Sequence, residues 1–251
     1  MQYQILKEPM AMIETQLDDG EQITSEAGAM VYIKGDIEIK TRTRQGGFFK
    51  KLKVSALGGQ SFFVNDYIAH EDGCVIGLSG PPIGDIIQMS ISNESGAGFI
   101  VHSGAYIAST SGVVLDTEWQ GFTKGIFGSE LFMLRVSGEG DLFLNAYGGI
   151  IHKELAESEK ITLSNYHLVA LNDTANYKII KFGGLKSTLL GGQGLVVEIV
   201  GPGSVYFQTK NIRQFIDSLG IQVGEGRGGS TDNISSSSES GISFGDFKFK
   251  I

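Results

Sequence analysis

The sequence predicts an all-β fold: three pseudo-repeats of short antiparallel strands that form a β-sandwich or barrel, followed by a short C-terminal helix. Glycine is unusually abundant, at 36 of 251 residues, about twice the usual share of roughly 7% and typical of many tight turns. Between these glycines lie short segments of alternating polarity, with almost no helical periodicity. Similar segments also recur along the chain, which predicts repeated units around one core.

A glycine-containing turn followed by an apolar strand occurs three times. The turns contain Gly80 and Gly84, then Gly138 and Gly140, then Gly201 and Gly203. We expect all six to be structural turn residues. For Gly138 and Gly201 we expect positive φ angles, because a Cβ atom would be strained in a tight turn between two apolar strands.

A second recurring segment lies upstream of each turn and begins near Leu57, Phe127 and Leu190. Together with the strand pairs that open each copy, it places the repeats at about 1–88, 95–146 and 155–210. We therefore expect one β domain over residues 1–215, in which the first repeat carries about eleven extra residues.

The C-terminal part has a different composition. Apolar residues at positions 212, 215, 216 and 219 predict a short helix, and the Gly/Ser-rich residues 220–241 predict a flexible linker. The last ten residues alternate aromatic side chains with Lys248 and Lys250. They are compatible with an edge strand, in this or a neighbouring subunit, and equally with a frayed tail.

Composition and charge exclude several classes of protein. The net charge of −8 argues against DNA binding, which depends on neutralising phosphates. The single cysteine, Cys74, excludes an internal disulfide framework. The N-terminal residues show no secretory signal and no stretch is suited to span a membrane, so we expect a cytoplasmic protein.

Reactive constellations are not apparent either. His70, His102, His152 and His167 are isolated, without the spacing of metal ligands. Residues 224–229 match a dinucleotide-binding fingerprint but follow no strand and open no helix. We therefore expect no metal, no cofactor, no catalytic residues and no enzymatic activity.

Four segments carry a resemblance to a known family: Ser25 to Val31, Leu57 to Phe63, Gly84 to Ile86 and Val169 to Asn172. Over roughly residues 1–210 the chain resembles the altered-inheritance-of-mitochondria family. The resemblance implies a fold like that of the tryptophan RNA-binding attenuation protein and assembly into symmetric oligomers. It implies no catalytic residues.

The three loops before the second recurring segment share a glycine followed by two apolar residues four apart, with lysines nearby. We interpret them as a candidate interaction surface formed by Phe48, Phe49, Lys50, Lys51, Leu52, Phe122, Lys124, Ile126, Leu185, Lys186 and Leu189. Gathered at one end of the domain, these residues would form an apolar platform with a basic rim. The alternative is that each loop plugs its own end of the barrel.

These features favour a non-enzymatic, homo-oligomeric scaffold or interaction module. A binder of small ligands or of lipid at a membrane surface, using one end of the barrel, is the alternative. The basic stretch Lys40 to Lys53 can mark a surface for phosphate or lipid headgroups, but a solvated long hairpin is the favoured interpretation. RNA binding by analogy of fold is a third possibility, which the acidic charge disfavours. The sequence specifies neither the small-molecule ligand nor the protein partner.

Overall fold

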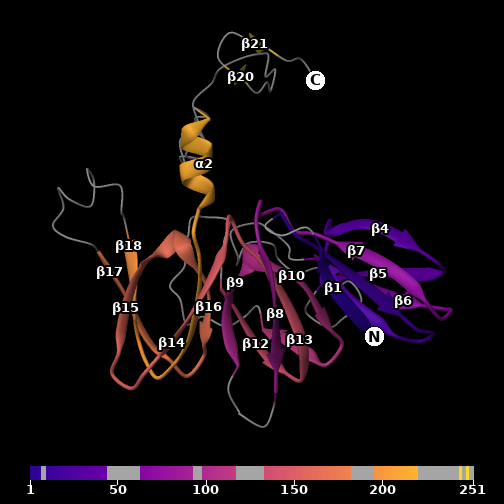
Figure 1. Cartoon of the computed structure of the whole chain (residues 1–251), viewed down its shortest axis with the longest axis horizontal. Helices are drawn as coiled ribbons and strands as arrows, with labels where there is room; N and C mark the ends of the chain where they lie inside the picture. Colours follow the sequence, from indigo (N-terminus) through magenta and orange to yellow (C-terminus); the bar gives the residue numbers. More distant parts are fainter. Residues whose placement is uncertain are drawn as a thin grey trace, which may run out of the picture. The chain divides into compact units, whose positions relative to one another are not determined.

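The structure is a computed structural model that describes residues 1–6, 10–43, 63–92, 98–116, 133–181, 195–219, 243–244 and 247–248. It confirms the all-β class, with several antiparallel sheets (Figure 1). The chain divides into two compact units, Met1–Lys210 and Asn211–Ile251.

The strands of the first unit fall into three groups of six that follow one another along the chain. The first group, preceded by β1 (Gln2–Leu6), comprises β2 (Met12–Leu17), β3 (Gln22–Glu26), β4 (Met30–Lys34), β5 (Ile37–Thr43), β6 (Phe63–Ala69) and β7 (Cys74–Leu78). The second comprises β8 (Ile86–Ile91), β9 (Phe99–His102), β10 (Tyr106–Thr110), β11 (Val113–Asp116), β12 (Met133–Gly138) and β13 (Gly140–Asn145). The third comprises β14 (Ile150–Leu155), β15 (Lys160–Ser164), β16 (Leu168–Asn172), β17 (Asn176–Lys181), β18 (Leu195–Val200) and β19 (Gly203–Gln208).

The same pairing pattern recurs in each group. One half-sheet, here called the front half-sheet, has the strand order β2-β7-β4, β8-β13-β10 or β14-β19-β16. The other, the back half-sheet, has the order β5-β6-β3, β11-β12-β9 or β17-β18-β15. All these pairs are antiparallel. Each group is thus one small sandwich of two half-sheets.

Neighbouring sandwiches share their sheets. The back half-sheet of the first group continues into the front half-sheet of the second through β3 and β10, and the second joins the third through β9 and β16. Two six-stranded shared sheets result, β5-β6-β3-β10-β13-β8 and β11-β12-β9-β16-β19-β14. The remaining half-sheets form two end sheets, β1-β2-β7-β4 and β15-β18-β17.

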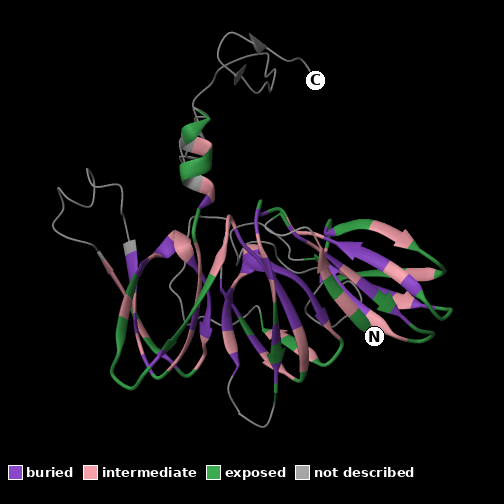
Figure 2. Cartoon of the chain, viewed as in Figure 1, coloured by how far each residue is buried: buried purple, intermediate pink, exposed green. Residues whose placement is uncertain are grey.

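Three apolar clusters fill the spaces between successive sheets, shown as buried segments in Figure 2. The first cluster includes Ile13 and Ile76 of an end sheet together with Tyr67 and Phe143 of a shared sheet. Alternation along each strand produces this arrangement, because successive side chains of a strand point to opposite faces. A shared sheet therefore supplies side chains to a different cluster on each of its two faces.

The turn glycines differ in their roles from what the sequence suggests. The φ angles of Gly138, Gly140 and Gly203 are 96°, 141° and 142°, so the prediction for Gly138 is confirmed. The prediction for Gly201 is wrong, because its φ does not lie in the left-handed region. Gly201 is instead restricted by close approach, since an added Cβ would lie 2.3 Å from the backbone oxygen of Ala156.

Gly80 and Gly84 do not occupy the same place as the other turn glycines. They lie in the link from β7 to β8, between the first two groups of strands. The turn that corresponds to Gly138–Gly140 is the link from β6 to β7, which contains Gly73 with φ of 75°. With this alignment, the first group spans 67 residues (12–78) and the second 60 residues (86–145), so the first repeat keeps some extra residues.

The second compact unit contains α2 (Ile212–Ser218), in agreement with the predicted helix, and the short strands β20 (Ser243–Phe244) and β21 (Phe247–Lys248). The Asn211 side chain caps the helix by accepting a hydrogen bond from the Gln214 amide at 2.9 Å. Within the described part of the chain, no helix combines the length and apolar character needed to cross a membrane.

One buried hydroxyl leads to a stability prediction. Thr15 is 0% exposed, and its Oγ1 has no hydrogen-bond partner among the described residues. A buried polar atom without a partner costs free energy, so Thr15→Val is expected to raise the free energy of unfolding by about 1 kcal/mol in urea titration. The matched control is Thr24→Val, because the Thr24 hydroxyl donates to Asp66 at 2.6 Å. This control should destabilise the protein, and equal effects of the two substitutions would contradict the argument.

Candidate functional site: the open edges of the end sheets

The predicted apolar platform cannot be compared with the structure. Its members, Phe48, Phe49, Lys50, Lys51, Leu52, Phe122, Lys124, Ile126, Leu185, Lys186 and Leu189, all lie outside the described residues. Of the basic stretch, the side chains of Lys40 and Arg42 are described, and each forms an ion pair, with Glu38 at 3.0 Å and with Asp66 at 2.5 Å. These two cations are therefore partly neutralised.

The end sheets offer the clearest candidate site, because each has an edge strand at the place where a shared sheet continues into a second half-sheet. A shared sheet joins a back half-sheet to a front half-sheet. One end sheet contains a front half-sheet that ends at β4, and the other contains a back half-sheet that ends at β15. Among the described strands, neither edge is paired on its outer side. Joined edge to edge, the two would make a third shared sheet.

The two junctions within the chain show how such an edge pair is built. In the first, Ala108 lies opposite Ser25, and in the second, Ala170 lies opposite Val101. β10 and β16 each contain a register irregularity one residue before this alanine. β4 contains the same irregularity, between Met30 and Tyr32. The β4 edge therefore has the backbone form that receives a back half-sheet elsewhere in the molecule.

Exposure of apolar side chains on β4 points the same way. Met30 and Val31 are 44% and 55% exposed. The corresponding residues of β10, Tyr106 and Ile107, are 1% and 0% exposed, and those of β16, Leu168 and Val169, are each 1% exposed. Two positions that are buried at both internal junctions are thus uncovered at the edge of this end sheet.

The β15 edge is uncovered in the same way. Thr162 lies opposite Glu198 and is exposed, whereas its counterparts at the internal junctions, Thr24 and Ile100, are 6% and 1% exposed. The two uncovered edges belong to opposite kinds of half-sheet. They are therefore complementary to each other and not to themselves.

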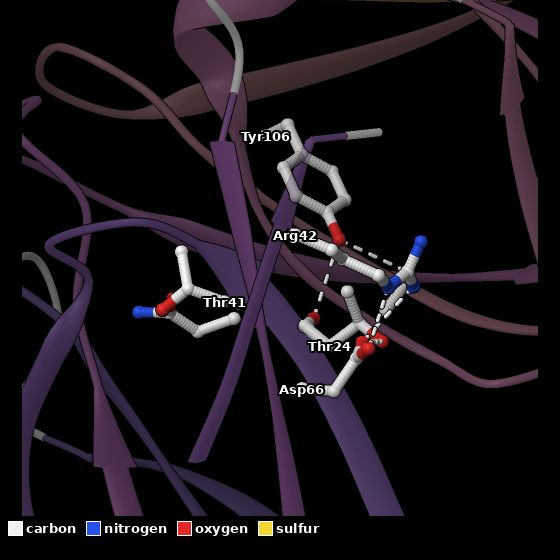
Figure 3. A network of polar contacts seen from close by, with 7 residues as sticks. Thr24, Thr41, Arg42, Asp66 and Tyr106 are labelled. Atoms are coloured by element: carbon white, nitrogen blue, oxygen red, sulfur yellow. Dashed lines mark hydrogen bonds and ion pairs between the residues drawn. The ribbon is translucent and has the colours of Figure 1, made fainter. Parts of the chain in front are cut away.

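A polar network stabilises the first internal junction (Figure 3). The Asp66 carboxylate accepts hydrogen bonds from the Thr24 hydroxyl at 2.6 Å and from the Arg42 guanidinium at 2.5 and 2.9 Å. The Tyr106 hydroxyl donates to the backbone oxygen of Thr24 at 3.2 Å and also lies 3.0 Å from the Ser109 hydroxyl. Residues of both strands that form the junction, β3 and β10, are thus tied together beside the ion pair.

Ion pairs recur at the corresponding place in the other back half-sheets. Arg135 occupies the position of Asp66 and pairs with Asp173 of the following group at 2.9 Å. Glu198 occupies it in the last group and pairs with Lys178 at 2.8 Å. The residue type changes while the paired charge is kept, which points to a structural role.

The network also shifts proton affinities. Burial alone would raise the pKa of Asp66, but the hydrogen bonds from Arg42 and Thr24 and the charge of Arg42 outweigh it, and the pKa lies below its usual value. The hydrogen bond to Asp66 raises the pKa of Arg42. The ion pair therefore stays charged at neutral pH.

Two of the described histidines lie close to a carboxylate. His70 lies 3.2 Å from Glu38, and His152 lies 3.4 Å from Glu154. No three His, Cys, Asp or Glu side chains come together as a metal site in the part of the chain that the structure describes. The candidate site therefore consists of strand edges and the side chains packed beside them.

Sequence reasoning missed the edges, although a signal for them exists. Ala27-Gly28-Ala29-Met30-Val31 and Ser103-Gly104-Ala105-Tyr106-Ile107 have closely similar patterns. Their alignment places Met30 and Val31 at the positions of two apolar residues that are buried in the second group. Only the pairing of β10 with β3 shows that the preceding half-sheet covers these two apolar residues of the second group.

These features define a class: an all-β protein of several antiparallel sheets, in which the end sheets have no further strand partner among the described residues. A family model for mitochondrial biogenesis AIM24 matches residues 3–210, and the chain belongs to this family. The predicted family resemblance is thereby confirmed.

Two similar proteins come from Streptococcus pyogenes. An uncharacterised protein of the serotype M6 strain is 26% identical over 215 residues, which are 83% of this chain and 85% of that protein. A crystal structure of a protein from the same species superposes with a TM-score of 0.70 at 23% identity and covers 87% of this chain and 98% of that one. The second comparison supports the fold.

Proposed function

We propose that this protein is a non-enzymatic scaffold in which copies of the chain join head to tail, with β15 of one copy added to β4 of the next. The observation that carries the proposal is the pair of complementary half-sheets at the two ends. Addition of β15 would give the sheet order β17-β18-β15-β4-β7-β2-β1, in which the strands from β17 to β2 repeat the order of the shared sheets. Unpaired edges of this kind are normally covered in native proteins.

The internal junctions specify the register of this contact. Leu163 corresponds to Val101 and Ser25, and Tyr32 corresponds to Ala170 and Ala108. Leu163 of one copy is therefore expected opposite Tyr32 of the next. Val31 would then enter the apolar cluster between the last shared sheet and the last end sheet of the preceding copy, as Ile107 and Val169 enter the clusters before them.

Head-to-tail contacts of identical chains close into a ring or grow into a filament. A ring appears as one sharp species, and a filament as a distribution that grows with concentration. The lipid and small-ligand alternatives depend on loops outside the described residues, and the acidic charge continues to disfavour RNA binding. The expected fold likeness to the tryptophan RNA-binding attenuation protein stays a prediction.

The test is the mass of the assembly in solution. Val31→Lys places a charge where the proposed contact buries an apolar side chain, so sedimentation should show the mass of a single chain. The matched control is Val114→Lys, because Val114 is 58% exposed on the β11 edge, which the contact does not use. A wild-type mass equal to one chain, or equal loss of assembly in both variants, would contradict the proposal.

A further inference from the structure

The first strand of the chain shows how a further strand can be added to a front half-sheet. β1 pairs with the edge strand β2, with Tyr3 opposite Thr15 and Ile5 opposite Ile13. Both Tyr3 and Ile5 pack against the first apolar cluster. The Tyr3 ring meets Phe143 edge to face, with ring centroids 5.1 Å apart. Phe143, beneath this added strand, is 0% exposed.

The second group has the same site without such a strand. β8 corresponds to β2 and forms the edge of its sheet among the described strands. Ile87 and Met89 correspond to Ile13 and Thr15, and Tyr206 of the next sheet corresponds to Phe143. Ile87 and Tyr206 pack against the same apolar cluster, yet both remain partly exposed.

The environment of Tyr206 prepares a surface for an aromatic side chain. His152 stacks on Tyr206 with ring centroids 4.5 Å apart and 11° between the planes, and the Phe99 ring lies edge to face with Tyr206 at 6.1 Å. In the first front half-sheet, Gly77 occupies the position of Tyr206 and Phe143, so no ring lies there. The β8 edge therefore lies beside a partly exposed aromatic cluster.

The charge of a nearby carboxylate favours a cationic residue between the two apolar side chains of an added strand. Gln4 of β1 lies opposite Glu14, and the residue that corresponds to Glu14 on β8 is Gln88. The Gln88 amide donates to the Asp141 carboxylate at 2.8 Å, and the Ser90 hydroxyl donates to the same carboxylate at 3.0 Å. The Gln88 amide also donates to the Tyr3 hydroxyl, so a cation opposite Gln88 would lie on the face that carries both this hydroxyl and the carboxylate.

We infer that β8 is a docking edge for an extended peptide segment with the pattern aromatic, cationic, aliphatic, which adds as an antiparallel strand. The aromatic residue lies opposite Met89 and packs on Tyr206, and the aliphatic residue lies opposite Ile87. Backbone hydrogen bonds to the edge supply affinity, and the alternate side chains supply specificity. The site is independent of the proposed assembly, which uses β4 and β15 and leaves β8 free.

The probe is a synthetic peptide with the sequence of residues 245–251, Gly-Asp-Phe-Lys-Phe-Lys-Ile. Its last three residues have the required pattern and parallel Tyr3-Gln4-Ile5. Fluorescence anisotropy with the full chain should show saturable binding, and the backbone NMR signals of Ile86 to Ile91 should shift. A peptide with serine at the position of Phe249 should bind at least about tenfold more weakly, because it lacks the aromatic anchor.

Two substitutions in the full chain locate the site. Ile87→Lys and Tyr206→Ser should each weaken binding by at least about tenfold. Ile151→Lys is the matched control, because Ile151 has the same position on the β14 edge and is 38% exposed. Tighter binding to a full chain that carries F247S and F249S would also support the site and identify the chain's own C-terminal sequence as a competitor. Equal binding by the Ile87→Lys and wild-type chains, shifts confined to another edge, or no binding at all would overturn the inference.

Discussion

Replacement of Gly84 by alanine is expected to lower the free energy of unfolding by about 3 kcal/mol or more. Gly84 forms a parallel bridge with Gly148, so that the link between the first two groups of strands lies against the link between the last two. An added Cβ would lie 2.2 Å from the Gly148 oxygen and 2.4 Å from the Ala146 oxygen. Backbone atoms cannot move aside as a side chain can, so the two links must separate.

Gly149→Ala is the control for this prediction. Gly149 lies in the same link as Gly148, but an added Cβ there would be 3.8 Å from the nearest side-chain atom, which is ordinary contact. Its effect should stay within about 0.5 kcal/mol. Urea titration of both variants makes the comparison. A loss of less than about 1 kcal/mol for Gly84→Ala would show that the links separate easily.

Mild acid is expected to destabilise the protein through His102. Burial lowers the pKa of His102 from 6.5 to about 4 in the folded chain. Between these values the unfolded chain binds a proton that the folded chain does not, so stability falls as the pH decreases through this window and is unaffected above it. Because the residue keeps some accessible surface, the loss between pH 7 and pH 5 should be at most about 2 kcal/mol.

The substitution His102→Gln removes this titration. Urea titrations of the wild-type chain at pH 7, 6 and 5 should show a steady loss of stability, and the variant should show a nearly flat profile. The carboxylates that pair with cations, such as Asp66, have lowered pKa values and lose their contribution only at more acidic pH. The same slope in both proteins would exclude His102 as the cause.

The class of fold could be predicted because it depends on local patterns. Glycine at turns and alternation within strands are visible in the sequence, and residues such as Gly138 have the predicted conformation. The position of the first repeat was harder to predict, because Gly80 and Gly84 resemble the turn glycines of the other groups. Their different role depends on strand pairing with partners distant in sequence, and no local pattern carries that information.

The candidate site illustrates the same limit. Nothing in the identity of Met30 and Val31 distinguishes them from ordinary core residues of a strand. They are exposed because no half-sheet in the described part of the chain lies next to β4, and this depends on the place of the first sandwich at one end of the row. The predicted apolar loops were identified from spacing within single segments and fall on residues that the structure does not describe.

Sharing of sheets makes the β unit a short one-dimensional array, in which each sandwich is stabilised by its own core and by its contacts with the next. In a single chain the middle sandwich has two neighbours and each outer one has a single neighbour. Thermal unfolding of isolated chains should therefore begin at the two ends and spread inward, with broad transitions. Within a closed ring of copies every sandwich would have two neighbours and no end would remain from which unfolding can start, so the transition should become sharper as well as higher in temperature.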